Sequence, residues 1–243
     1  MRIPRIYTSQ ALAVGQQLEL EERAAHYLAQ VLRMKVGRQL RLFNGDGRDY
    51  QATISAANRR QLSCEITGAE SNTQRESPLQ IELGIGLSKG DRMDWVVQKA
   101  TELGATRIAP LYSERVDVKL DGEREQKKWR HWQQVMISAC EQSGRSQLVD
   151  LAEPQPLASW LQHCRADCKL VLSPHHQSQP QRDSAPQSIA LLVGPEGGLS
   201  EEEVAASVAS GFSSLALGPR ILRTETAPLA ALSILQARWG DMA

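Results

Sequence analysis

Three short apolar runs, each followed at once by a proline turn, most strongly limit how this chain can fold. The runs are 169–172, 189–193 and 214–217, and the turns after them are Ser173-Pro174, Gly194-Pro195 and Gly218-Pro219. Continuous apolar runs of this length are typical of strands that are covered on both faces of a parallel sheet. Since ligands of open α/β sheets bind beyond the carboxyl ends of the strands, we expect the three turns to form one pocket.

The chain around these runs alternates between strand and helix patterns. Strands are expected at 79–87 and 107–112, and helices at 88–103, 123–140, 156–165, 200–210 and 228–239. Ser88 is a candidate cap for the first of these helices and Gly104 its stop. Ser200 and Glu203 form a capping box at the start of the fourth. Residues 73–243 are therefore expected to form an α/β domain.

Residues 1–72 show a different pattern, with shorter elements and more turns. Strands are expected at 18–20, 39–43, 50–54 and 62–66, with a turn at Gly45-Asp46-Gly47 and a helix at 23–33. Several short strands with tight turns predict a small β-barrel, and the polar segment 70–77 is interpreted as a linker between two domains. Residues 1–72 carry 10 basic and 7 acidic side chains, whereas the whole chain is neutral. This excess suits contact with a polyanion, but a solvated surface explains it equally well.

Composition and motif content exclude several classes of function. The longest apolar runs are about five residues, far below the ~20 that a membrane helix needs. The N-terminal residues lack the apolar core of a signal peptide, so a cytoplasmic enzyme with no membrane partner is expected. The chain has no G-x-G-x-x-G, no P-loop lysine, no G-x-S-x-G and no H-E-x-x-H, which argues against the usual dinucleotide, P-loop, hydrolase and zinc-protease sites.

The four cysteines raise the question of a metal site. Cys164 and Cys168 are four residues apart, with His163, His175 and His176 nearby. A zinc knuckle would place two cysteines two residues apart. That spacing is missing, so packing cysteines and no metal are predicted.

The strongest site candidate is the charged segment 217–227, which follows the last apolar run. It holds Arg220, Arg223, Thr224, Glu225 and Thr226. Glycine-proline turns expose backbone amides and carbonyls that can bind an adenine edge or a ribose, so a nucleotide-like pocket is expected here. A second candidate is Glu141-Gln142-Ser143-Gly144-Arg145, where a carboxylate, an amide and a guanidinium gather at a helix end.

Several segments of the chain resemble one known family. The segments 193–199, 217–227, 139–145 and 99–104 look like signatures of the bacterial 16S ribosomal RNA uridine-N3 methyltransferases, the RsmE family of the SPOUT superfamily. Residues 5–7 and 31–33 resemble the small PUA-like RNA-binding barrel of that family. The resemblance implies a parallel α/β sheet with a C-terminal trefoil knot, a homodimer, S-adenosylmethionine as methyl donor and S-adenosylhomocysteine as product. Its implied substrate is a uridine of the small ribosomal subunit, in the decoding region of the 16S RNA.

The resemblance also implies roles for individual residues. The implied donor-binding residues are Leu172, Val193, Gly194, Pro195, Glu196, Gly198, Leu217, Gly218, Ile221, Leu222, Thr224, Thr226 and Ala227. The implied catalytic residues are Arg145, Arg220, Arg223 and Glu225. The implied RNA-binding residues are Arg2, Arg5, Arg33, Lys35, Arg38, Lys89, Arg115, Glu141, Gln142 and Arg145.

Two roles stay open for Glu225. Its carboxylate could orient or deprotonate the uridine imide, or it could stabilise the start of the last helix. The arginines could instead stabilise negative charge on the base, with Arg145 reaching in from a partner subunit. Two other functions also stay open: methylation of a ribose 2′-hydroxyl or another base, and a non-catalytic role in RNA binding or ribosome assembly.

Overall fold

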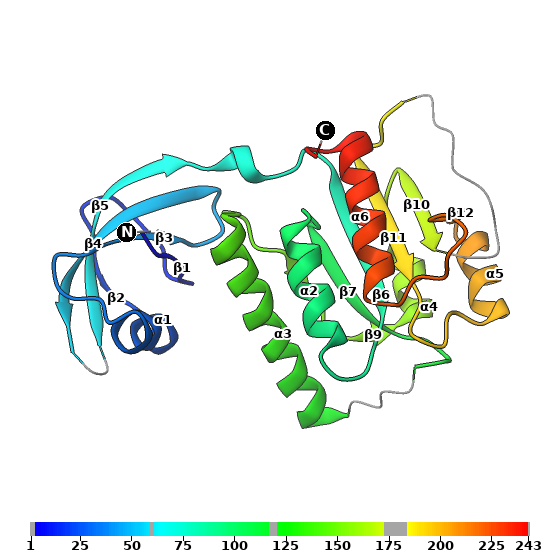
Figure 1. Ribbon diagram of the computed structural model, residues 1–243, viewed down its shortest axis with the longest axis horizontal. Coiled ribbons are helices and arrows are strands. Elements are labelled where there is room, and N and C mark those ends of the chain that lie inside the picture. Colours follow the sequence, from blue (N-terminus) through cyan, green and yellow to red (C-terminus); the bar gives the residue numbers. More distant parts are fainter. Residues whose placement is uncertain (1–2, 59–60, 117–120, 173–183, 243) are drawn as a thin grey trace. The chain divides into compact units, whose positions relative to one another are not determined.

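The computed structural model describes residues 3–58, 61–116, 121–172 and 184–242. The chain divides into two compact units (Figure 1). The first consists of Met1–Glu76 together with Cys140–Leu148, and the second of Ser77–Ala139 together with Val149–Ala243. The first unit therefore extends beyond residue 72 and takes in a segment from much later in the chain.

The first unit is built on a five-stranded sheet with the order β1-β3-β4-β5-β2. Its strands are β1 (Arg5–Tyr7), β2 (Gln17–Glu19), β3 (Gln39–Phe43), β4 (Arg48–Ala57) and β5 (Leu62–Ser71). The expected hairpin is confirmed: β3 and β4 pair antiparallel, and Gly45 and Gly47 take positive φ values of 96° and 85° in the turn. β5 continues to Ser71, so the first residues of the expected linker are strand, and the short helix η2 (Thr73–Arg75) follows.

A short helical segment packs on the core of this unit. It consists of α1 (Glu22–His26) and the π-helix η1 (Tyr27–Val31), where one continuous α-helix to residue 33 was expected. Ala24, Ala25 and Leu28 are buried against the core side chains of the sheet. After the π-helix, Arg33 takes φ 51°, an uncommon value for a residue other than glycine.

The end of α3 (Gly122–Ser143) belongs to the first unit because polar contacts hold it there. A guanidinium nitrogen of Arg5 donates to the Cys140 carbonyl at 2.9 Å. The Glu141 carboxylate accepts from the Tyr7 amide at 3.0 Å and pairs with Arg23 at 2.8 Å. These partners are more than 100 residues apart in sequence, so no local pattern could have predicted the contacts.

The second unit contains a sheet in which every strand pair is parallel, as predicted. The strand order is β12-β10-β11-β6-β7-β8, and β9 also pairs with β7. The strands are β6 (Gln80–Gly86), β7 (Arg107–Tyr112), β8 (Asp150–Leu151), β9 (Gln155–Pro156), β10 (Cys168–Leu172), β11 (Ser188–Val193) and β12 (Ser213–Leu215). β8 and β9 were not predicted, because two residues are too few to show a periodicity.

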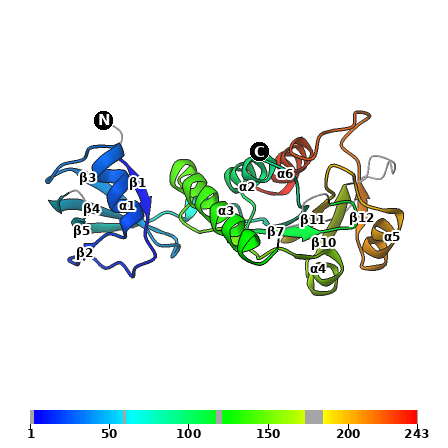
Figure 2. The same ribbon diagram turned by 90° about the horizontal axis from the view of Figure 1, so that it is seen from below.

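Helices cover both faces of this sheet. They are α2 (Arg92–Glu102), α3, α4 (Leu157–His163), α5 (Glu201–Ala209) and α6 (Thr226–Trp239). α2 and α6 pack together on one face, and α4 lies on the other (Figure 2). Trp160 of α4 is buried against Ala109 and Leu192 of the sheet. Within the described residues, no helix has both the length and the apolar character needed to cross a membrane.

The helix boundaries test two capping predictions. The capping box at α5 is confirmed: the Glu203 amide donates to Ser200 Oγ at 3.3 Å, and the Ser200 amide donates to the Glu203 carboxylate at 2.9 Å. The prediction for Ser88 is wrong. α2 begins four residues later, with Asp91 in the N-cap position, and the Ser88 hydroxyl instead donates to the Gly86 carbonyl at 3.4 Å.

Candidate active site

A cavity of about 310 Å³ lies at the carboxyl ends of β10, β11 and β12. These strands are hydrogen-bonded neighbours in the sheet, so their carboxyl ends lie side by side. The volume of this cavity is at the lower end of the range for small-molecule sites. Its lining residues are Arg115, Leu172, Val193, Gly194, Pro195, Glu196, Gly197, Gly198, Leu199, Val204, Leu215, Leu217, Gly218, Arg220, Ile221, Leu222, Thr224 and Ala227. We call this space the donor cavity.

The structure brings together twelve of the thirteen residues that were expected to bind the donor, all except Thr226. Of the three expected turns, Gly194-Pro195 lines the cavity with both residues and Gly218-Pro219 with Gly218, while Ser173-Pro174 lies outside the described residues. Thr226 is the first residue of α6 and is exposed. The clustering follows from the parallel sheet, but the binding role of each residue remains a prediction.

Glycines shape the backbone of the donor cavity in different ways. A side chain at Gly194 would place its Cβ 3.0 Å from the Leu199 amide nitrogen, so Gly194 is needed for close backbone approach. Gly198 takes φ 71°, and its amide donates to the Pro195 carbonyl at 2.9 Å, which closes a tight turn. Gly218 takes φ 93°, and no described atom would lie within 4 Å of a Cβ added there.

We therefore expect Gly218→Val to act through backbone conformation and not through overlap. A left-handed conformation costs an L-residue about 1–2 kcal/mol, and a β-branched side chain is at the upper end. The turn should move out of this conformation, and donor affinity should fall by about 10-fold or more. Calorimetric titration with the donor measures this, with Gly15→Val, a positive-φ glycine of the first unit, as the control for general strain. Unchanged affinity would contradict the assignment of Gly218 to the donor cavity.

Gly86 packs against the backbone of the turn that lines the donor cavity. The sequence alone did not lead us to expect this residue at the site. It is the last residue of β6, and a Cβ there would lie 2.5 Å from the backbone nitrogen of Pro195. The strand contains the sequence Leu83-Gly-Ile-Gly86. Glycine inside an apolar strand often marks a close approach of another backbone, so this was the available signal.

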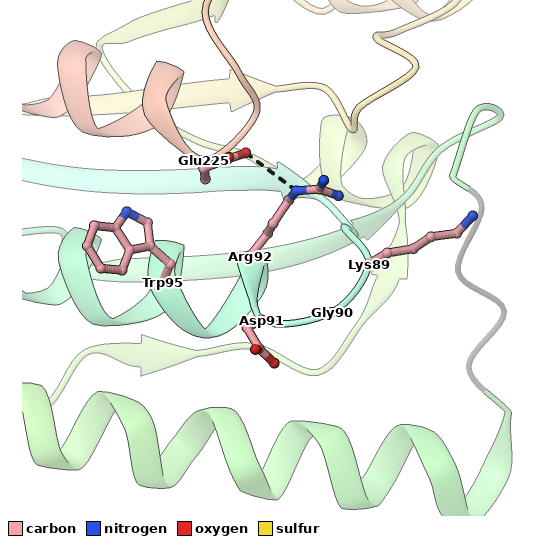
Figure 3. A pocket seen from close by; sticks show the side chains of 6 residues that line it. All are labelled: Lys89, Gly90, Asp91, Arg92, Trp95 and Glu225. Carbon is pink, nitrogen blue, oxygen red and sulfur yellow. Dashed lines mark ion pairs between the residues drawn. The ribbon is translucent and has the colours of Figure 1, made fainter.

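Arg92 is a second residue that was missed, and it joins two loops of the site. It is the first residue of α2. Its guanidinium lies 2.6 Å from the Glu196 carboxylate. It also lies 3.7 Å from the Glu225 carboxylate (Figure 3). Burial raises the pKa of Glu196, but hydrogen bonds from backbone amides, including that of Lys89, and from Arg92 hold this pKa below its ordinary value. Glu196 is therefore ionised at neutral pH.

Glu225 faces a second cavity of about 610 Å³, which we call the α2 cavity. It is lined by Lys89, Gly90, Asp91, Arg92, Trp95 and Glu225 (Figure 3). Glu225 occupies the N-cap position of α6, but its side chain makes no capping hydrogen bond within the described chain. The alternative in which this side chain caps the last helix by a hydrogen bond is therefore not supported.

The other two charged residues of the loop differ in position. Arg220 is exposed and lines the donor cavity. Arg223 is exposed too, and it is not among the residues described as lining either cavity. Its carbonyl accepts hydrogen bonds at 2.9 Å from the amides of Thr226 and Ala227 and so helps to start α6.

Arg145 and Glu141 lie in the first unit and do not line the donor cavity. Arg145 pairs with Glu76 at 3.0 Å, with side chains only 6% and 10% exposed. Gln142 is exposed at the end of α3. The carboxylate and the guanidinium that suggested a site at this helix end thus hold the end of α3 within its unit.

Arg145→Ala is expected to destabilise the protein strongly. Removing one partner of a buried pair leaves the other charge uncompensated, which costs about 3–5 kcal/mol. Lys99→Ala is the control, because Lys99 and Glu102 form a more exposed pair, with 27% and 26% exposure, whose loss should cost about 1 kcal/mol or less. Denaturant unfolding followed by circular dichroism measures both. Equal stability of the two variants would show that the Arg145 pair contributes no more than a surface pair.

The basic residues expected to bind RNA fall into three groups. Arg33, Lys35 and Arg38 are exposed on the loop after the π-helix. Arg5 is largely buried: it pairs with Asp49 at 2.7 Å and lies over the Phe43 ring at 3.7 Å, so its position is that of a core residue. Lys89 lines the α2 cavity, Arg115 lines the donor cavity, and Arg2 lies outside the described residues.

All four cysteines are buried, and none forms a disulfide with another. Burial raises the pKa of Cys64 and of Cys164 to about 11, so both are protonated at neutral pH. Among the residues that the structure describes, no group of three or more His, Cys, Asp or Glu side chains could hold a metal ion. His175 and His176 lie outside this part.

Comparisons with known proteins agree on one family. Residues 75–236 match the family model of the RNA methyltransferase domain, and residues 20–67 match that of the RNA methyltransferase PUA domain. Ribosomal RNA small subunit methyltransferase E of Buchnera aphidicola subsp. Schizaphis graminum is 35% identical over 99% of this chain and 98% of its own length. The protein of the same name from Bacillus subtilis is 33% identical over 94% and 93%.

Two solved structures are similar over their whole length. One is from Legionella pneumophila, described as a methyltransferase in complex with the bound cofactor SAM, with 43% identity, a TM-score of 0.95 and coverage of 99% of this chain and 100% of that one. The other is a ribosomal RNA small subunit methyltransferase E from Neisseria gonorrhoeae bound to S-adenosylmethionine, with 38% identity, a TM-score of 0.94 and full coverage of both chains.

Proposed function

The chain belongs to the ribosomal RNA small subunit methyltransferase E family, and we propose that it methylates N3 of a uridine in the decoding region of the 16S RNA with S-adenosylmethionine as donor. The observation that carries this proposal is the donor cavity, where apolar walls and glycine turns meet at the ends of three parallel strands. Two similar structures are described with this donor bound.

The donor cavity suits a nucleoside ligand. Leu172, Val193 and Leu217 offer apolar surface for an adenine ring, and the turns at Gly194 and Gly218 expose backbone groups to its edge. When bound, S-adenosylmethionine supplies a methyl group that its sulfonium has already activated. The protein's task is therefore to position the acceptor and to manage one proton.

Residues around Glu225 are the candidates that handle the proton of the acceptor base and the negative charge that its loss leaves behind. The uridine imide must lose its N3 proton before or during methyl transfer, and the Glu225 carboxylate is the candidate that orients or accepts it. The Arg92 guanidinium lies 3.7 Å from this carboxylate. Arg220 and Arg223 are the candidates that stabilise negative charge on the base oxygens.

Further parts of the proposal rest on the family. We infer that the first unit, with its match to the PUA domain, contacts the 16S RNA, and that the protein acts in the cytoplasm. A homodimer and a trefoil knot in the second unit belong to the same proposal, but the burial of Arg145 in its pair with Glu76 speaks against the expected contribution of Arg145 to a partner subunit. Light scattering of the purified protein tests the homodimer.

The most direct experiment offers labelled donor to naked 16S RNA and, separately, to small subunits that lack the modification. Nucleoside mass spectrometry of the product should find N3-methyluridine. Methylation of a ribose 2′-hydroxyl or of another base would replace the proposed reaction. Donor binding without methyl transfer to either substrate would favour the non-catalytic alternative.

RNA affinity should depend on salt through the exposed loop of the first unit. Replacing Arg33 with asparagine, which tolerates positive φ, and Lys35 and Arg38 with alanine removes three positive charges. In a plot of log K for RNA association against log salt concentration, the slope is negative, and its magnitude should decrease by about 2–3. The matched control removes Arg124, Lys127 and Arg130, which are exposed on α3, and filter binding at several salt concentrations compares the two variants. Equal changes would argue against a special role of the first unit.

A further inference from the structure

The segment after β7 brings a guanidinium to the wall of the donor cavity. Arg115 lines this cavity and is exposed to solvent. One of its guanidinium nitrogens donates to the Gly197 carbonyl at 3.3 Å. Gly197 lines the cavity too, so this contact places the positive charge of Arg115 at the edge of the ligand space. A guanidinium has five N–H donors, and one bond to a carbonyl leaves others for a ligand.

Contacts of the neighbouring residues hold the backbone of Arg115 in place. The Glu114 amide donates to the Glu203 carboxylate at 2.8 Å, and the same carboxylate belongs to the capping box of α5. The Val116 amide donates to the Ser113 carbonyl at 3.2 Å, which forms a turn around Arg115. A side chain whose backbone is fixed on both sides loses less conformational freedom when it binds a ligand.

Gly197 allows the close approach of Arg115. A side chain at residue 197 would place its Cβ 3.0 Å from the Arg115 Cβ and 3.3 Å from the Arg115 carbonyl oxygen. The strand β6 separates β7 from β11 in the sheet, so the loop after β7 crosses one strand end to reach the donor cavity. Packing within the sheet does not require this crossing, whereas a guanidinium that serves the donor cavity does.

The charges of the donor cavity can be matched to those of the donor. S-adenosylmethionine carries a positive sulfonium and, at the end of its methionine part, a positive amino group and a carboxylate. Among the described residues that line the cavity, the charged ones are Arg115, Glu196 and Arg220. Glu196 is negative and pairs with Arg92. The two arginines are therefore the candidates that bind the donor carboxylate.

Of these two arginines, Arg115 is the better held. Arg220 follows the exposed residues Gly218 and Pro219. Among the described residues, no backbone hydrogen bond joins 218–222 to the rest of the chain. Arginine–carboxylate pairs are frequently bidentate, and this geometry needs a guanidinium of fixed orientation. The hydrogen bond to the Gly197 carbonyl gives Arg115 such an orientation.

We propose that Arg115 binds the carboxylate of the methionine part of the donor. The residue thereby selects ligands that carry this group over other adenosine sulfonium compounds. This inference rests on the proposed function, of which it uses only the donor. It assigns Arg115 to the donor, whereas the sequence suggested a contact with RNA.

The test is calorimetry with S-adenosylmethionine and with decarboxylated S-adenosylmethionine, because these ligands differ only in the carboxylate. The wild type should bind the complete donor on the order of 10- to 100-fold more tightly. Arg115→Met keeps an unbranched side chain but removes the charge. It should bind both ligands with the affinity that the wild type has for the decarboxylated one. Arg115→Lys should retain part of the difference, since lysine keeps the charge but not the planar fork.

The matched control is Arg130→Met, which changes an exposed arginine of α3 and should keep the full difference between the ligands. Equal affinity of the wild type for the two ligands would overturn the proposal, as would a loss of the difference in Arg220→Met alone. If Arg115→Met keeps the difference but raises KM for RNA, Arg115 contacts RNA and the proposal is wrong. If Arg115→Met weakens both ligands equally, the residue only supports the turn at Gly197, which also overturns the proposal.

These titrations need neither RNA nor methyl transfer, so their outcome is separate from that of the proposed reaction. If Arg115 distinguishes the two ligands but no N3-methyluridine forms, the proposed reaction fails and the carboxylate site stands. If N3-methyluridine forms while the two ligands bind equally, the reaction stands and the carboxylate site fails.

Discussion

Glu225→Gln is expected to lower the methyl-transfer rate by about 10²- to 10⁴-fold, the usual contribution of a general acid–base group. Glutamine has nearly the same shape as glutamate but cannot accept the imide proton. Glu225 is not among the residues described as lining the donor cavity, so donor affinity should stay the same. Single-turnover rates with small subunits or RNA, together with donor calorimetry, separate the two effects.

The control for Glu225→Gln is Glu202→Gln, an equal change of charge at an exposed position in the first turn of α5. It should leave both the rate and the donor affinity unchanged. A normal rate in Glu225→Gln would remove Glu225 from the chemistry and leave the arginines as the charge-stabilising groups. A loss of donor affinity in that variant would show instead that Glu225 acts on the donor cavity through Arg92 and Glu196.

Local signals in the sequence predicted some elements that depend on neighbouring residues and misled at others. The capping box of Ser200 and Glu203 is a contact between residues three apart, and the structure forms it. The apolar run at 189–193 forms β11, and Ile189 through Val193 are all buried there, as a strand covered on both faces requires. Ser88 misled because it can cap only a helix that starts beside it, and α2 starts at Arg92.

The donor cavity could be predicted for the same reason, since three neighbouring strand ends must lie along one edge of a parallel sheet. Residues that enter the site from elsewhere could not. Arg92 reaches Glu196 across 104 residues of sequence, and nothing in its local pattern shows this. Arg5 shows the opposite error: its charge suggested an RNA contact, whereas Asp49 and the Cys140 carbonyl hold it inside the first unit.

Gly86→Ala should disrupt the donor cavity although residue 86 does not line it. The added methyl group would lie 2.5 Å from the Pro195 nitrogen and 3.0 Å from the Gly194 carbonyl carbon, which are backbone atoms and cannot rotate away. Overpacking of this kind costs about 1–3 kcal/mol. Because β6 is paired along its length with β7 and β11, the turn at Gly194-Pro195 is the part that is freer to move. Donor affinity should therefore fall by on the order of 10- to 100-fold.

Gly68→Ala is the matched control for this variant, because Gly68 also lies in a strand but its Cβ would meet only the flexible side chain of Gln51, at 3.5 Å. Calorimetry with the donor should show normal affinity for Gly68→Ala and weak affinity for Gly86→Ala, with both proteins folded by circular dichroism. If Gly86→Ala binds the donor normally but unfolds more easily, then β6, and not the turn at Gly194-Pro195, has moved to make room for the added methyl group. The donor cavity would then be held by its own loops, and the support from β6 would be one of stability alone.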